Sequence, residues 1–269
     1  MTSAVSGKLF EFENNQLRFR RLGYGKSTLL AFHGFGQTGQ VFTDLEKTLG
    51  ERYTILAVDL FFHGESRYNA SQLLTKSYWQ KMLNAFLTSE HVDRFSLLGF
   101  SMGGRFALAT AECFSNRVDE LFLIAPDGIT RSIWYELATT TSAGRGLFRY
   151  VLAHLSVLNV IGHLLTRLGL LNRTVMRFAE LSLSTSEQRD LVYNSWVEFR
   201  FIRPDLKRIS QLLNQHPVAV HFFIGAFDRI IPGRYILPLT RGLSQYQLTV
   251  LRTGHNRLIE LTGAKLSTP

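Results

Sequence analysis

The feature that most constrains the fold is a series of short apolar runs, each of which ends in a small or polar residue. Six of these runs are TLLAFHGF, YTILAVDL, RFSLLGFS, ELFLIAPD, VAVHFFIGAFD and QLTVLRTGH. Segments with helical patterns lie between them, such as VFTDLEKTLG, SYWQKMLNAFLTSE and GGRFALATAECFSNRV. Strands that are buried on both faces are continuously apolar, and their alternation with helices indicates a mostly parallel sheet flanked by helices. The sequence therefore predicts an α/β fold.

Two regions depart from this rhythm. Near the start, LFEFE and LRFRR alternate apolar and polar residues around Asn14 and Asn15, which predicts a β-hairpin. Residues 128–212 have helical periodicity and little strand character. We therefore expect a core formed by residues 1–127 and 213–269, with a helical cap, residues 128–212, inserted after the sixth strand.

Composition narrows the class of protein. A hydrophobic content of 45% over 269 residues is enough to bury a sizeable core. The single cysteine, Cys113, excludes an internal disulfide framework and a zinc site built on thiolates, and it favours a reducing compartment. The first residues, MTSAVSGKLFEFENN, contain no basic segment followed by an apolar stretch, so we expect a cytoplasmic protein.

The net charge of +9 is spread along the chain and does not form a basic run interleaved with aromatic residues. This distribution argues against a nucleic-acid partner. The predicted cap holds 11 Lys and Arg residues against six Asp and Glu residues. Residues 150–166 contain none of these four types but are too few to span a bilayer, so we expect a buried helix pair there. Peripheral membrane contact through the basic flanks is the minor alternative.

The strongest motif is GFSMGG, which places Ser101 between an apolar run and a helical pattern. A GxSxG pattern needs small residues around the serine because the serine lies on a strained turn from strand to helix, which exposes its hydroxyl above the sheet. A serine hydroxyl is a weak nucleophile, so it requires a base that is itself oriented by an acid. The sequence therefore predicts Ser101 as a nucleophile.

Candidates for the base and for the acid that orients it follow the last two apolar runs. His255 follows the last run and Asp228 follows the one before it, and the order Ser, Asp, His is the one expected for a triad on such a sheet. Asp127 also follows an apolar run and is the rival acid. We favour Asp228 because Pro232 after it fits a loop that leads into a helix. Asp127 is then the turn residue before the cap.

A second loop, HGFGQTGQ, follows the first buried run and supplies backbone groups. We expect the backbone N–H groups of Phe35 and Met102 to form an oxyanion hole. For His33 we prefer a structural role, in which the side chain forms a hydrogen bond to its own loop. No residue cluster calls for a metal, and the mechanism requires no cofactor.

The motifs HGFGQTG, DLFFHGES, GFSMGG, GAFDRIIP and TGHNRLIE together resemble the α/β-hydrolase superfamily over essentially the whole chain outside the cap. The resemblance implies a core sheet of eight strands, the second of them antiparallel, and a triad of Ser101, Asp228 and His255. It also implies that 59–66 is the structural loop after the fourth strand. The sequence SMGGR, with Arg105, is similar to that of the menaquinone-pathway synthase, a lyase of the same superfamily.

These patterns favour a serine hydrolase that acts on a carboxylic ester or related acyl substrate through an acyl-enzyme. The cap composition suggests an apolar or amphipathic small-molecule substrate. One alternative is hydrolysis of a carbon–carbon bond, or a lyase reaction, on an anionic substrate that Arg105 or cap arginines bind. Another alternative is a ligand-binding receptor-like homologue that retains the pocket. The patterns identify neither the substrate nor the oligomeric state.

Overall fold

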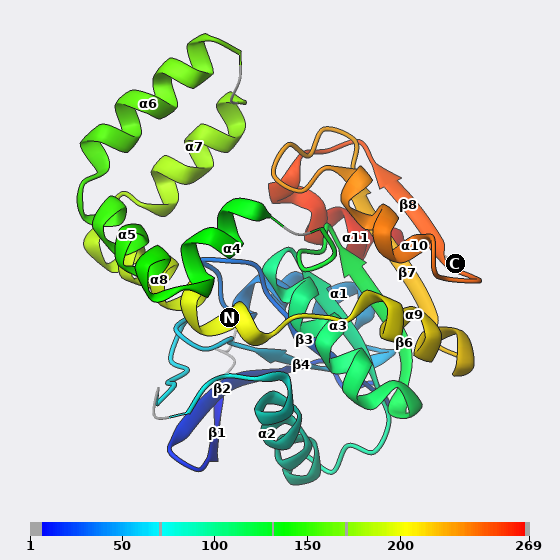
Figure 1. Ribbon diagram of the computed structural model, residues 1–269. Coiled ribbons are helices and arrows are strands. Elements are labelled where there is room, and N and C mark those ends of the chain that lie inside the picture. Colours follow the sequence, from blue (N-terminus) through cyan, green and yellow to red (C-terminus); the bar gives the residue numbers. More distant parts are fainter. Residues whose placement is uncertain (1–6, 70–71, 131, 170–171, 267–269) are drawn as a thin grey trace, which may run out of the picture. The chain divides into compact units, whose positions relative to one another are not determined.

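One eight-stranded sheet forms the centre of the computed structural model, which describes residues 7–69, 72–130, 132–169 and 172–266 (Figure 1). The strands follow the spatial order β1-β2-β4-β3-β5-β6-β7-β8. Their bounds are β1 Lys8–Phe12, β2 Asn15–Leu22, β3 Ser27–Phe32, β4 Tyr53–Val58, β5 Phe95–Phe100, β6 Val118–Ile124, β7 Ala219–Gly225 and β8 Gln247–Leu251.

The sheet is parallel except around its second strand. β1 and β2 form the hairpin expected at the Asn-Asn turn, with Phe12 opposite Asn15, and β2 is also antiparallel to β4. The pairs from β4 through β3, β5, β6 and β7 to β8 are all parallel. The predicted fold, a mostly parallel eight-stranded sheet with an antiparallel second strand, is confirmed.

Helices cover both faces of the sheet. On one face α3 (Met102–Phe114) lies against β3, β5 and β6, flanked by α2 (Lys76–Ser89) and α9 (Leu206–Gln215). On the other face α1 (Thr43–Leu49) and α11 (Leu258–Leu266) contact each other. The short helix α10 (Leu237–Thr240) contacts α9.

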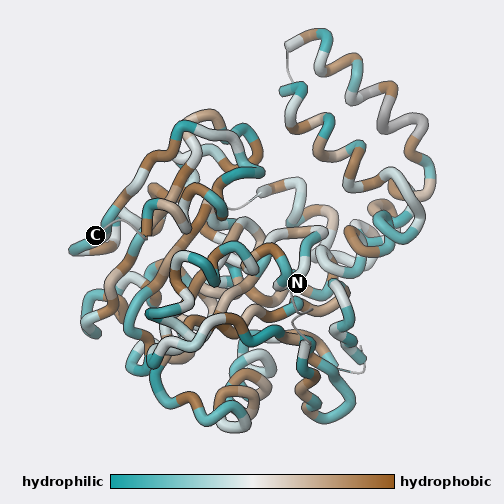
Figure 2. The backbone as a smooth tube through the Cα atoms, turned by 180° about the vertical axis from the view of Figure 1, so that it is seen from behind, coloured by the Kyte–Doolittle hydropathy of each residue, from teal (hydrophilic) through white to brown (hydrophobic). Residues whose placement is uncertain are grey.

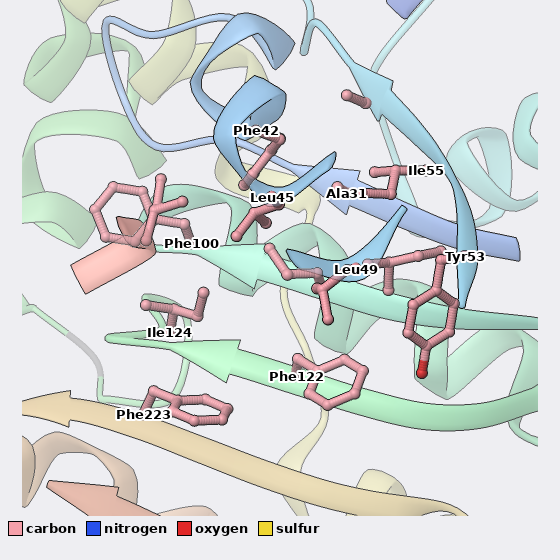
Figure 3. Close-up of a cluster of buried hydrophobic side chains, with 14 of the residues drawn as sticks. Ala31, Phe42, Leu45, Leu49, Tyr53, Ile55, Phe100, Phe122, Ile124 and Phe223 are labelled. Carbon is pink, nitrogen blue, oxygen red and sulfur yellow. The ribbon is translucent and has the colours of Figure 1, made fainter. Parts of the chain in front are cut away.

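The core under α1 and α11 consists of aliphatic and aromatic side chains. Leu45 of α1 lies in one buried cluster with strand residues such as Ile55 and Phe122 (Figure 3). Leu258 of α11 belongs to the same cluster. Burial of side chains of this size is worth about 1.5–3 kcal/mol each relative to exposure. The sheet is therefore held from both sides, and its strand ends are fixed in position.

The chain divides into two compact units, one formed by Met1–Thr130 with Ile202–Pro269 and the other by Arg131–Phe201, here named the core unit and the helical unit. The helical unit contains α4 (Ile133–Thr140), α5 (Ser142–Ala153), α6 (Leu155–Arg167), α7 (Arg173–Ser182) and α8 (Ser186–Glu198). The expected cap was longer, 128–212. The difference lies mainly in α9, whose side chains pack on α3 and α10 of the core unit.

The expected burial of residues 150–166 is observed only in part. Leu152 is buried, whereas Tyr150, Val160 and Leu164 are exposed, although α6 contacts α5 and α7. Among all the residues that the structure describes, no helix has both the length and the apolar character needed to cross a membrane.

Candidate active site

Three polar side chains from three loops meet at the carboxyl edge of the sheet. Ser101 lies between β5 and α3, Asp228 follows β7, and His255 follows β8. The Nδ1–H of His255 donates to Asp228 Oδ2 over 2.6 Å, and the hydroxyl of Ser101 donates to His255 Nε2 over 3.0 Å. Parallel strands all end at this edge, which is why residues 154 positions apart can form one hydrogen-bonded chain.

Ser101 occupies a sharp turn from strand to helix. Its φ of 52° and ψ of −119° lie outside the regions that side chains favour. The turn requires glycine on both sides: a Cβ on Gly99 would lie 2.7 Å from the Ala107 Cβ, and a Cβ on Gly103 would lie 2.0 Å from the Phe32 carbonyl oxygen. The GxSxG spacing therefore follows from the close approach of α3 to the sheet, and it leaves the hydroxyl facing His255.

Asp228 is fixed by its own loop. Its side chain is fully buried, and Oδ1 accepts hydrogen bonds from the backbone N–H groups of Ile230 and Ile231 at 2.8 and 3.0 Å. The second oxygen, Oδ2, is left to accept the His255 proton. A carboxylate that is held by two amides has a defined orientation, and it specifies the tautomer of the ring it faces.

His255 lies between this carboxylate and Ser101 with little exposure. Its side chain is 8% exposed, and its ring centroid lies 5.0 Å from that of Phe100. With Nδ1 donating to Asp228, the neutral ring presents the lone pair of Nε2 to the Ser101 hydroxyl. This is the arrangement needed to remove a proton from Ser101.

Two backbone N–H groups are candidates for an oxyanion hole. Met102 is the first residue of α3, where N–H groups have no acceptor within the helix. Phe35 lies in the loop after β3, and no acceptor for its amide is found among the residues that the structure describes. The loop is braced by Gly34, whose N–H donates to Gln37 Oε1 over 3.1 Å.

Two buried histidines, His33 and His63, contact the loop after β3. His33 Nδ1–H donates to the Gly34 carbonyl, and its Nε2 accepts from the Leu60 amide, so its role is structural as expected. Burial lowers the pKa of His33 to about 3 and that of His63 to about 4. The ring of His63 lies edge-on to Phe35, 5.6 Å between centroids. Sequence reasoning did not single out His63, although it lies within the DLFFHGES motif.

The loop from Asp59 to Ser66 is closed by hydrogen bonds to its first residue. Asp59 Oδ1 accepts from the Gly39 amide and from Arg20, and the Ser66 hydroxyl donates to the Asp59 carbonyl. These contacts fit the structural role that the resemblance implied for this loop.

The rival carboxylate has a different partner. Asp127 Oδ2 accepts from Arg105 Nη2 over 2.5 Å, and the Asp127 amide donates to the Ser101 carbonyl. Asp127 is therefore tied to the backbone of the serine turn and to Arg105, and the hydrogen bond to His255 comes from Asp228. Within the described residues, no group of three or more His, Cys, Asp or Glu side chains is arranged to hold a metal ion.

Comparison with known proteins agrees with this geometry at the level of the fold. A hydrolase from Pseudomonas aeruginosa PA01 superimposes with a TM-score of 0.68 at 18% identity, over 98% of this chain and 97% of that one. The meta-cleavage product hydrolase CumD of Pseudomonas fluorescens IP01 gives a TM-score of 0.65 at 18% identity, over 97% and 94%.

Sequence relatives match over shorter segments. The sn-1-specific diacylglycerol lipase ABHD11 of Danio rerio is 33% identical over 105 residues, which are 38% of this chain and 32% of that protein. The chain spans about a third of the length of the first curated relatives it matches. The family profile described as the alpha/beta hydrolase fold matches residues 27–260, which is most of the chain. The chain therefore belongs to the α/β hydrolase fold family.

Proposed function

We propose that the protein is a serine hydrolase that cleaves carboxylic esters or related acyl compounds through an acyl-enzyme. The observation that carries the proposal is the hydrogen-bonded chain from Asp228 Oδ2 through His255 to the Ser101 hydroxyl. A hydroxyl becomes an effective nucleophile when a base within hydrogen-bond reach is itself oriented by a third group.

In the proposed reaction, Ser101 Oγ attacks the acyl carbon while His255 Nε2 takes its proton. The oxyanion that forms accepts hydrogen bonds from the Phe35 and Met102 amides; loss of one such donor costs about 10²–10³ in rate. His255 then returns the proton to the leaving alkoxide, which departs as an alcohol. Water, deprotonated by the same histidine, releases the acid and restores Ser101. Asp228 stabilises the imidazolium during both steps.

The names of similar proteins support hydrolytic chemistry without fixing the bond that is cleaved. They include a diacylglycerol lipase and a hydrolase of meta-cleavage products. We favour acyl-ester cleavage over carbon–carbon cleavage of an anionic substrate held by Arg105. The guanidinium of Arg105 is bound to Asp127 at 2.5 Å, and its side chain is only 14% exposed, so we assign Arg105 to positioning the Asp127 loop.

Covalent labelling tests this proposal most directly. A fluorophosphonate probe should label the wild-type protein at Ser101 and leave the Ser101→Ala variant unlabelled. p-Nitrophenyl esters of graded chain length should be hydrolysed, with kcat lowered by about 10⁴–10⁶ in Ser101→Ala. A protein that neither takes up the probe nor turns over any ester would exclude a serine hydrolase and favour the receptor-like alternative.

A further inference from the structure

The helices α6 and α7 form an antiparallel hairpin within the helical unit (Figures 1 and 2). They approach closely at Gly162, where an added Cβ would lie 2.6 Å from Met176 Sδ. His163 Nε2 and Glu180 Oε1, 3.0 Å apart, join the two helices beside this contact. These two contacts hold α6 and α7 together as one structural element.

A groove of about 630 Å³ runs along one face of the hairpin. Arg167 lines it from α6, and Arg173 and Arg177 line it from α7. No ion pair is found for these three arginines among the described residues, and Glu180 is the one acidic residue in the lining. Glu180 faces His163, so the groove carries a net positive charge of at least two at neutral pH.

Two exposed apolar ridges lie on the hairpin, one on each helix, and the ridge on α6 is not part of the groove lining. Along α6 and its C-cap, Val160, Leu164 and Leu168 follow one another every fourth residue and are 69%, 54% and 62% exposed. At about 100° per residue they form one stripe, beside Arg167. On α7, Phe178 and Leu181 are three residues apart, and Leu181 itself reaches the groove lining. Hydrophobic and hydrophilic residues alternate along the coloured parts of both helices (Figure 2).

We propose that this hairpin face, defined by Arg167, Arg173, Arg177 and the two apolar ridges, docks on bilayers that contain anionic phospholipids. Phosphate oxygens of the headgroups would accept hydrogen bonds from the arginines, whose planar guanidinium groups match phosphate geometry. The leucines and Phe178 would enter the region between headgroups and acyl chains, as the apolar side of an interfacial helix does.

The combination of charge and exposed apolar surface selects this occupant. A soluble polyanion would satisfy the arginines but would leave Val160, Leu164 and Leu168 in water. A neutral apolar partner would desolvate three arginines without compensation. An anionic bilayer offers phosphate groups to the arginines and an apolar layer to the neighbouring apolar side chains. This binding does not depend on the proposed catalytic residues.

Vesicle co-sedimentation tests the proposal with the whole 269-residue chain. We expect wild type to bind vesicles of phosphatidylcholine with phosphatidylglycerol and to bind phosphatidylcholine alone far more weakly. Each arginine near an anionic surface contributes about fivefold to partitioning, so Arg173→Gln with Arg177→Gln should lower the partition coefficient about 25-fold. Leu164→Ser with Leu168→Ser should lower it by at least about tenfold.

Matched controls separate docking from general attraction. Lys81→Gln with Arg241→Gln removes the same charge from exposed positions of the core unit and should leave binding near the wild-type level. Ser101→Ala should bind as wild type does, which keeps this test independent of the proposed hydrolase activity. Circular dichroism should show unchanged helix content in each variant.

Three results would overturn the proposal. The first is wild-type protein that does not prefer anionic vesicles. The second is binding that survives the arginine or the leucine substitutions in folded protein. The third is an equal loss of binding in the core-unit control, which would assign the attraction to net charge alone.

Discussion

Replacing Asp228 by Asn would reverse the hydrogen-bond polarity beside His255. The wild-type carboxylate accepts from the amides of Ile230 and Ile231 through Oδ1 and from His255 through Oδ2. An Asn side chain has one acceptor oxygen and one NH₂ donor group. If the oxygen faced His255, the NH₂ would oppose two backbone N–H donors, and each buried donor left unpaired costs about 1–3 kcal/mol. The loop therefore forces the oxygen towards itself and the NH₂ towards His255.

Facing an NH₂ donor, His255 Nδ1 must accept, and the neutral ring then carries its proton on Nε2. That nitrogen lies 3.0 Å from Ser101 Oγ and could no longer take the hydroxyl proton. A wrong tautomer of this kind lowers kcat about 10⁴-fold, which corresponds to about 5.5 kcal/mol of barrier. The substitution preserves the shape of the side chain, so the fold should be retained.

Steady-state hydrolysis of a p-nitrophenyl ester measures this loss, and Asp127→Asn is the matched control. Asp127 contacts Arg105 and not the His255 ring, so its variant should keep a kcat close to the wild-type value. The reasoning is refuted if Asp228→Asn retains more than about a tenth of wild-type kcat, or if Asp127→Asn loses as much activity.

Two further predictions concern stability. Gly103→Ala should lower both the melting temperature and the activity, because its Cβ would lie 2.0 Å from the Phe32 carbonyl oxygen. Gly146→Ala, at an exposed helical site with open space around it, should instead stabilise the folded protein by about 0.5–1 kcal/mol. A similar shift of the melting temperature in both variants would contradict this prediction. For His63, the folded pKa of about 4 lies below the unfolded value of 6.5, so stability is complete above about pH 6.5 and is lost as the pH falls towards 4, at up to about 1.4 kcal/mol per pH unit. His63→Asn keeps a donor for the Phe61 carbonyl and should reduce this slope in urea unfolding between about pH 7 and pH 5; equal slopes in the two proteins would refute the assignment.

The sheet was predictable because its signal is local. Each buried strand is a continuous apolar run, and the residues that follow these runs meet at one edge because parallel strands share a direction. The turn at Ser101 could also be recognised from the sequence, since the close packing of α3 on β3 and β5 requires glycine at fixed positions around it. The position of Asp228 at the end of β7, on the same edge as His255, follows for the same reason.

What the sequence could not supply depends on tertiary contacts. Asp127 and Asp228 both follow strands, and only the geometry shows that one faces Arg105 and the other His255. The pattern of α9 is helical, as is that of α8, and helical periodicity alone does not tell that α9 packs on α3 and α10 of the core unit. The exposure of the α6 leucines was missed because an apolar face gives the same periodicity whether a partner covers it or not.

The position of the helical unit in the chain allows this unit to change in evolution without a change in Ser101, Asp228 or His255. It enters through one connection, between β6 and β7, and α9 still completes the crossover between those strands without it. Thr130 at one end is held by a hydrogen bond to the Tyr235 carbonyl, and Ile202 at the other end is fully buried in the core unit. Ser101, Asp228 and His255 all lie outside the insertion. The helical unit can therefore be lengthened, shortened or exchanged as a cassette while the hydrogen bonds among these three residues stay as they are.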